Sequence, residues 1–186
     1  MFGRLSGLSG PRVAFARVSL GAFFLLPILK FRKKLGYTLV KLKEKPLHLL
    51  APGASLALNW AFLFTAFNYT TIANAVLVYY VSPALAMLIS WRFLGESLDR
   101  RNVAGIGMAF TGLLLITSSQ KISLSDRDFM GIVLAFLAAF FYALIPNLGR
   151  FLRDIDGESL TFFQLAIAAL LLLPFVAVNR AGRPVW

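Results

Sequence analysis

The chain has 186 residues, of which 59% are hydrophobic and only 15% charged, and its mean hydropathy is +0.76. Soluble domains contain roughly 45–50% apolar residues, so this composition excludes an ordinary soluble domain. The formal net charge of +11 would suit a nucleic-acid-binding protein, but such proteins are far less apolar. The chain has no Cys and one His, which excludes disulfides, thiolate catalysis and metal sites built from several Cys or His residues. The remaining class is a membrane protein with basic loops.

Charged residues divide the chain into apolar segments of bilayer length. The segment from Leu49 to Trp91 contains no charged residue and no His. A single helix of that length would be roughly 65 Å long, about twice the hydrocarbon thickness, so two helices with a turn at 68–71 are expected. The apolar runs are continuous and longer than barrel strands, which disfavours strands. The sequence predicts an all-α polytopic membrane protein with six transmembrane helices, at about 11–29, 47–67, 72–93, 103–119, 129–150 and 159–178.

The distribution of basic residues predicts the orientation of these helices in the plasma membrane. The loop 30–46 is the most basic connection, and such loops stay on the cytoplasmic side. If successive helices cross the membrane in alternating directions from this loop, twelve basic residues lie inside and six outside. Both ends of the chain then lie outside. The inner set is Lys30, Arg32, Lys33, Lys34, Lys41, Lys43, Lys45, Arg92, Arg100, Arg101, Arg150 and Arg153, and the outer set is Arg4, Arg12, Lys121, Arg127, Arg180 and Arg183. The basic loop is interpreted as a topology determinant, with anionic-lipid or nucleic-acid binding as the alternative.

Two segments of the chain match each other. Val13–Pro27 and Leu160–Pro174 share Phe, Ala, Leu, Leu and Pro residues at a constant offset. If these helices are equivalent, the repeat contains five helices, and an odd number inverts the second copy, as in many secondary transporters. The predicted repeats are 1–120, without its first helix, and 121–186, with two helices, so that the chain would correspond to helices two to seven of ten. The alternative is a complete six-helix protein with a coincidental match.

The segment Ala66–Glu96 resembles the EamA-type transporters of the drug/metabolite transporter superfamily, through the mid-helix Pro83 and the closing Leu94-Gly95-Glu96. Gly105–Ile116 and Gly131–Arg150 resemble the fifth and sixth helices of that family. The resemblance implies a fold of inverted five-plus-five helix repeats around a central cavity. It also implies transport of small metabolites or drugs across the membrane by alternating access.

Polar side chains within the predicted helices are the candidates for lining a substrate cavity. In the third predicted helix, Asn74 and Ser82 share one face, whereas Tyr79, Tyr80 and Pro83 lie opposite, and the sequence does not decide between these faces. For each polar residue, a hydrogen bond between helices is the alternative role. The full set of cavity candidates is Ser55, Asn59, Asn74, Tyr79, Tyr80, Ser82 and Tyr142.

Three further residues are candidates for gating or structural roles. Arg17 lies about two turns inside the first predicted helix, where a charge must reach the membrane surface, find a partner or line a cavity. Pro83 has no N–H for the carbonyl of Tyr79, so a kink is expected there. Glu96 follows the third helix, and a surface ion pair with neighbouring Arg residues is favoured over a coupling role.

These features favour a transporter over an enzyme. Apart from the peripheral His48, the predicted helices contain no His, Cys, Asp or Glu, so catalytic, cofactor-binding and metal residues are not expected. The expected partners are a small-molecule substrate, the lipid bilayer, and either a second copy or complementing helices, with no nucleic acid. The alternative is an inactive or helix-associating membrane fragment with no transport of its own.

The absence of Cys allows a clean test of orientation. A single Cys introduced as Gly36→Cys should react with a membrane-impermeant maleimide only after the cytoplasmic side is exposed, because loop 30–46 is predicted to be cytoplasmic. Labelling of Gly36→Cys from outside intact cells would reverse the predicted orientation.

Overall fold

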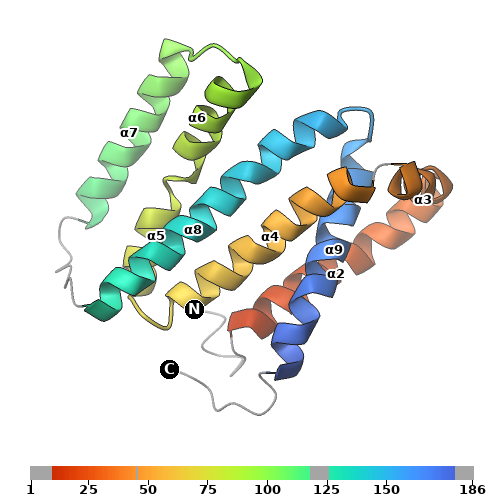
Figure 1. Cartoon of the computed structure of the whole chain (residues 1–186), viewed down its shortest axis with the longest axis horizontal. Coiled ribbons are helices and arrows are strands. Elements are labelled where there is room, and N and C mark those ends of the chain that lie inside the picture. The colour runs from red at the N-terminus through yellow and green to blue at the C-terminus, as the bar shows by residue number, and fades with distance from the viewer. Residues whose placement is uncertain (1–9, 45, 118–125, 179–186) are drawn as a thin grey trace. The chain divides into compact units, whose positions relative to one another are not determined.

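The computed structural model describes residues 10–44, 46–117 and 126–178, and the regular elements in these ranges are helices (Figure 1). Arg4, Lys45, Lys121, Arg180 and Arg183 of the predicted topology lie outside the described residues. The helices are α2 (Gly10–Phe31), α3 (Leu35–Glu44), α4 (Pro46–Ala66), α5 (Ile72–Tyr79), α6 (Ser82–Leu94), α7 (Arg100–Thr117), α8 (Asp126–Gly149), the 3-10 turn η1 (Arg150–Leu152) and α9 (Gly157–Val178).

Five segments of the described chain are helical, long and apolar enough to cross a membrane. They are Arg12–Phe31, Pro46–Ala66, Ile72–Leu94, Arg127–Leu152 and Gly157–Pro174. The protein is therefore a multi-pass membrane protein, and five of the six predicted spans meet the criteria of length and composition. The remaining predicted span, 103–119, falls on α7 as far as residue 117. This helix begins with Arg100-Arg101-Asn102 and is less apolar than the other five segments. The span at 103–119 and the inverted repeat stay predictions.

The chain forms two compact units, each of which is described by itself. Unit 1 comprises Met1–Ala61 and Leu148–Trp186, and unit 2 comprises Phe62–Asn147. Both α4 and α8 cross from one unit into the other near their C-terminal ends. This division follows contacts in space and cuts across the two predicted sequence repeats, so it does not test them.

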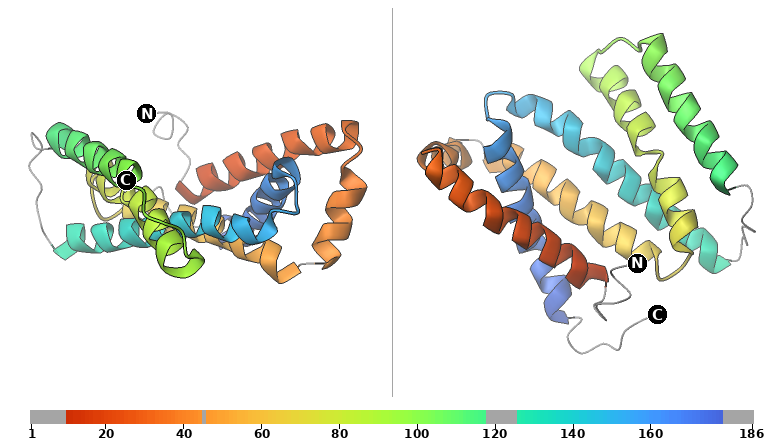
Figure 2. Two further views of the ribbon diagram at one scale, coloured as in Figure 1. Left: turned by 90° about the horizontal axis from the view of Figure 1, so that it is seen from above. Right: turned by 180° about the vertical axis from the view of Figure 1, so that it is seen from behind.

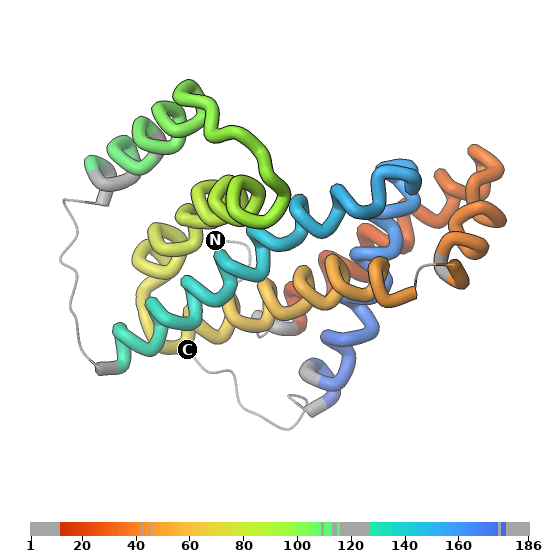
Figure 3. Tube along the Cα trace, turned by 45° about the horizontal axis from the view of Figure 1, so that its top comes forward, coloured from red at the N-terminus to blue at the C-terminus, as the bar shows by residue number. Residues whose placement is uncertain are grey.

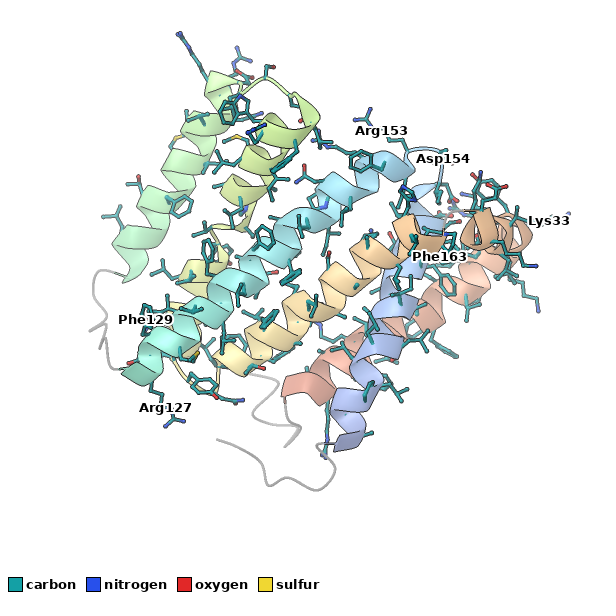
Figure 4. The ribbon with its side chains drawn as sticks, in the orientation of Figure 1. Lys33, Arg127, Phe129, Arg153, Asp154 and Phe163 are labelled. Carbon is teal, nitrogen blue, oxygen red and sulfur yellow. The ribbon has the colours of Figure 1, made fainter. Side chains whose placement is uncertain are left out.

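Unit 1 is held together by close packing of α2 and α4 with α9. The two segments with matching sequences, α2 and α9, pack against each other and run in opposite senses (Figures 1 and 2). Small residues allow this approach: a Cβ on Gly21 would lie 3.0 Å from Leu165 Cδ1, and one on Gly53 would lie 2.6 Å from Ile167 Cβ. An apolar cluster closes the end near α3, where Phe163 is labelled in Figure 4; its buried members are Leu49, Leu152, Ile155 and Phe163.

Unit 2 has a core of small side chains. Ala66, Ala75 and Ala135 are fully buried where the end of α4, α5 and α8 meet. The predicted turn at 68–71 is confirmed: Thr71 caps α5 by accepting a hydrogen bond from Asn74 N at 3.2 Å. The predicted kink is confirmed as well, because the span Ile72–Leu94 is divided into α5 and α6 just before Pro83, as the tube in Figure 3 shows.

The basic connection 30–46, expected as a loop, contains a helix; its interpretation as a topology determinant stays a prediction. Residues Leu35–Glu44 form α3, and Figure 2 shows this helix running across the direction of α2. Leu, Lys and Glu residues favour helix formation, but so short a helix is marginal alone and needs tertiary contacts. Those contacts come from the segment before α9, described below.

The glycine at the α4–α9 contact provides a test of this packing. Gly53→Ala should destabilise the protein by about 1–3 kcal/mol, because the new methyl group would overlap Ile167 Cβ and Cγ2 rather than the end of a flexible side chain. Gly105→Ala in α7 is the matched control: its new methyl group meets nothing within 4 Å, and the helix gains roughly 1 kcal/mol. The measurement is thermal unfolding in detergent, and equal stabilisation by both changes would contradict the close approach of α4 and α9.

Candidate functional site

The kink between α5 and α6 brings two of the cavity candidates together in unit 2. The rings of Tyr79 on α5 and Tyr142 on α8 lie 5.5 Å apart between centroids, tilted by 52°. Nearby along α8, Phe141 stacks on Phe62 at 5.6 Å. Tyr142 is 45% exposed. The two tyrosines therefore form an aromatic pair beside an irregular point of a membrane span.

The other candidates on this span divide into a buried and an exposed set. Asn74 and Ser82 are buried, whereas Tyr80 is 54% exposed and Pro83 is exposed. Asn74 serves its own helix: its Nδ2 donates to Thr70 Oγ1 at 3.3 Å, and its backbone N–H donates to the cap Thr71. These partners lie at the start of the same helix, so they are not the bonds between helices that were the alternative role for the polar residues.

The Leu94-Gly95-Glu96 sequence has a structural explanation. Gly95 ends α6 in the left-handed conformation, with φ of 68°, which favours glycine. The chain then turns back, so that the N–H groups of Gly95 and Glu96 donate to Ser90 O, and the Ser90 hydroxyl donates to the Glu96 carboxylate. Ser90 is the partner that sequence reasoning missed; the predicted ion pair of Glu96 with Arg residues stays a prediction.

Asn147 is a second polar residue that sequence reasoning missed. Its Nδ2 donates to Ala143 O at 2.8 Å on its own helix and to Ala86 O at 3.1 Å on α6. This buried amide therefore ties α8 to α6. The available signal was an amide side chain within an otherwise apolar span.

In unit 1, Ser55 and Asn59 lie on the same buried face of α4, as their spacing of four residues predicts. Arg17 of α2 lies with its guanidinium 4.9 Å from the ring centroid of Trp60 on α4. This cation–π contact gives the intramembrane charge a partner that the sequence did not indicate. It joins the two helices at the end of unit 1 opposite α3.

A polar cluster at the α3 end of unit 1, here called the α3 clamp, joins one face of α3 to the segment 154–159. Lys34 Nζ donates to Asp156 Oδ1 at 2.8 Å and to Glu158 Oε2 at 3.2 Å. Thr38 and Ser159 share a buried hydrogen bond of 2.8 Å. The clamp is completed by a pair between Lys41 and Asp154 at 3.6 Å, by a hydrogen bond from Tyr37 to Asp154 O, and by a pair between Arg32 and Glu158.

The clamp shifts the pKa values of its members. The hydrogen bond to Asp156 raises the pKa of Lys34 above its ordinary value, and the hydrogen bond to Glu158 adds a smaller effect in the same direction. Desolvation lowers this pKa by less. Desolvation alone would raise the pKa of Asp156, but hydrogen bonds from Lys34 and Ser159 outweigh it and leave that pKa lowered. Both groups are thus held in their charged forms at neutral pH. Within the described ranges, no group of three or more His, Cys, Asp and Glu side chains is placed to hold a metal ion.

Comparison with known proteins identifies the relatives of this chain. Residues 2–118 match the EamA-like transporter family. An uncharacterized transporter of Bacillus subtilis (strain 168), YxxF, is 35% identical over 135 residues, which cover 72% of this chain and 43% of that protein. An uncharacterized transporter of Archaeoglobus fulgidus is 31% identical over 134 residues, which cover 71% and 46%. The chain spans less than half the length of these two relatives.

A solved crystal structure is also similar. It matches with a TM-score of 0.77 at 22% sequence identity, and the match covers 95% of this chain and 59% of that chain. This likeness shows that the chain shares the fold of the matched part of that protein.

The shifted pKa values predict how the clamp responds to pH. Asp156→Asn should lower the melting temperature at neutral pH by about 2–4 °C, the effect of about 1 kcal/mol in a chain of this size. Because the pKa of Asp156 is lower in the folded protein than in the unfolded chain, its negative charge stabilises the fold at pH values above the ordinary carboxyl pKa. This stabilisation is lost as the pH falls through the lowered pKa of the folded protein. The difference between wild type and variant should therefore shrink below about pH 4. Glu44→Gln is the control, because Glu44 pairs with Lys41 inside α3 and is 48% exposed; an equal effect there would contradict the clamp.

Proposed function

Because this chain belongs to the EamA-like transporter family, we propose that it forms part of a carrier that moves small metabolites or drugs across the plasma membrane by alternating access. The match of residues 2–118 to this family is the observation that carries the proposal. The transporter names of both relatives support it, and they favour a transporter over an enzyme.

The geometry of unit 2 supports a site beside the kink. Transporters often bind their substrates where a membrane helix is interrupted, since the irregular backbone lines a cavity there. Here the interruption lies between Tyr79 and Ser82, and the Tyr79–Tyr142 pair adjoins it. Aromatic faces and uncharged hydroxyl groups suit a small neutral substrate that can stack and accept or donate a hydrogen bond. Of the other cavity candidates, Ser82 and Tyr80 adjoin the kink, whereas Ser55, Asn59 and Asn74 are proposed on their polarity and burial alone.

The inverted repeat completes the proposal. Repeats at 1–120 and 121–186, in a fold of five plus five helices, would bring related helices from the two copies together, and the packing of α2 on α9 is compatible with this. The cytoplasmic position of residues 30–46 belongs to the same arrangement. A second copy or complementing helices would cover the remaining membrane-facing surfaces. The competing function, a helix-associating fragment with no transport of its own, has no observation that favours it.

Transport in reconstituted vesicles tests the proposal. The chain should show saturable uptake of at least one member of a panel of amino acids, sugars and drugs. Tyr142→Ala should weaken that uptake about two- to tenfold, because an aromatic pair contributes roughly 0.5–1.5 kcal/mol. Tyr69→Ala is the matched control, since Tyr69 is similarly exposed (41%) but lies in the turn before α5. If no compound shows saturable uptake, the chain is not an autonomous transporter; equal losses in both variants would remove the Tyr79–Tyr142 pair from the site.

A further inference from the structure

The side of α3 away from the clamp, together with the adjoining end of α2 and the turn after it, is a surface that the proposed transport site does not use. We call this surface the α3 basic face. Its members are Leu39, Val40 and Lys43 of α3, Lys30 and Phe31 of α2, and Lys33 of the turn. It lies at a membrane boundary, because α3 follows the span Arg12–Phe31 and directly precedes the span Pro46–Ala66. Figure 2 shows α3 running across α2, so a bilayer crossed by α2 would have α3 along its surface. This is the placement of an interfacial helix.

The clamp determines which side of α3 faces outward. Lys34, Thr38 and Lys41 are spaced three or four residues apart and face the segment 154–159. The opposite face carries Leu39 and Val40, each 52% exposed. Beside it, at the end of α2, Phe31 is 91% exposed. Such exposure of aliphatic and aromatic side chains is unfavourable in water but favourable in the acyl region just below lipid headgroups.

The charges on this face are left uncompensated by the clamp. The acidic residues near α3 pair with Arg32, Lys34 and Lys41. Lys30, Lys33 and Lys43 are exposed, and residues 10–44, 46–117 and 126–178 provide no ion pair for them. Figure 4 shows Lys33 at the edge of unit 1, on the side of α3 opposite Asp154. The face therefore combines three unpaired ammonium groups with an exposed apolar stripe.

The backbone at Lys33 gives a second, independent observation. Lys33 has a φ of 56° and is the one non-glycine residue with a positive φ in the described part of the chain. It occupies the turn that ends α2, where Lys34 N–H donates to Leu29 O at 2.9 Å and Lys33 N–H donates to Lys30 O at 3.1 Å. Glycine is the usual residue in this motif because a side chain is strained there. Strain of this kind tends to mark a functional position, here one occupied by a lysine.

We propose that the α3 basic face binds anionic phospholipids of the leaflet in which α3 lies. Phe31, Leu39 and Val40 enter the acyl region, and the ammonium groups of Lys30, Lys33 and Lys43 contact headgroup phosphates. Apolar insertion and basic residues together are the two signals that give stable attachment to an anionic membrane surface. A soluble polyanion such as nucleic acid would satisfy only the charges and would leave Phe31 in water.

Lipid selectivity of the full chain in detergent, measured by native mass spectrometry, tests this proposal. The chain should retain phosphatidylglycerol in preference to phosphatidylcholine with the same acyl chains. A triple variant, Lys30→Gln with Lys33→Asn and Lys43→Gln, should lose at least about tenfold of that preference. The matched control Arg92→Gln with Arg100→Gln and Arg101→Gln removes the same charge from unit 2 and should change it less than about twofold.

Lys33→Gly separates binding from folding. Glycine relieves the left-handed strain, so the melting temperature should rise or stay unchanged, while the preference for phosphatidylglycerol falls. Three results would overturn the proposal: no preference in the wild-type chain, equal losses in the two triple variants, or displacement of phosphatidylglycerol by a short oligonucleotide at equal concentration.

Discussion

The structure depends on one constraint: in hydrocarbon, every backbone N–H and C=O must find its partner inside the protein. Helices meet this requirement locally, which explains why the long apolar stretches of this chain are helical. Prolines break the pattern at Pro27, Pro52, Pro83, Pro146 and Pro174, since each removes one donor. Pro146 removes the helical donor for the carbonyl of Tyr142. The amide of the next residue, Asn147, binds two other carbonyls, those of Ala143 and Ala86, and so ties α8 to α6 rather than repairing the helix at the proline.

Outside the spans, the shortage of acidic residues governs the structure. The chain has 19 basic and 8 acidic residues, and half of the acidic ones, Glu44, Asp154, Asp156 and Glu158, pair with basic residues in or next to α3. This use of scarce carboxylates fixes one face of α3 and leaves the remaining lysines on the other. A helix too short to be stable alone is thereby held in a defined orientation.

Sequence reasoning was most successful where the signal is local. The helix at 129–150, the turn at 68–71 and the kink before Pro83 need only hydropathy and proline chemistry, and all three are present. It failed where partners are distant in sequence: α3 is organised by residues more than a hundred positions later, and Arg17 stacks on a Trp of another helix. On the third span, Asn74 and Ser82 are both buried and Tyr80 and Pro83 are both exposed, as the predicted faces have it. Which of the two faces lines a cavity depends on the neighbouring helices, which the sequence of one span does not specify.

The two units, each taken alone, differ in how firmly they are held. Unit 1 combines glycine-mediated contacts, a large-side-chain core and charged pairs, which all resist rearrangement. Unit 2 has a glycine contact of its own, since a Cβ on Gly131 would lie 2.6 Å from Thr70 Cβ, but its core is built of alanines and one of its spans is kinked. The apolar window of that span, 72–94, is 11% buried, against 22% for each of the unit 1 spans 12–31 and 157–174. Small side chains bury little area, so shifting them costs less free energy than breaking a cluster of leucines and a phenylalanine. Within unit 2, the kinked span beside Tyr142 is therefore the segment held by the least buried packing.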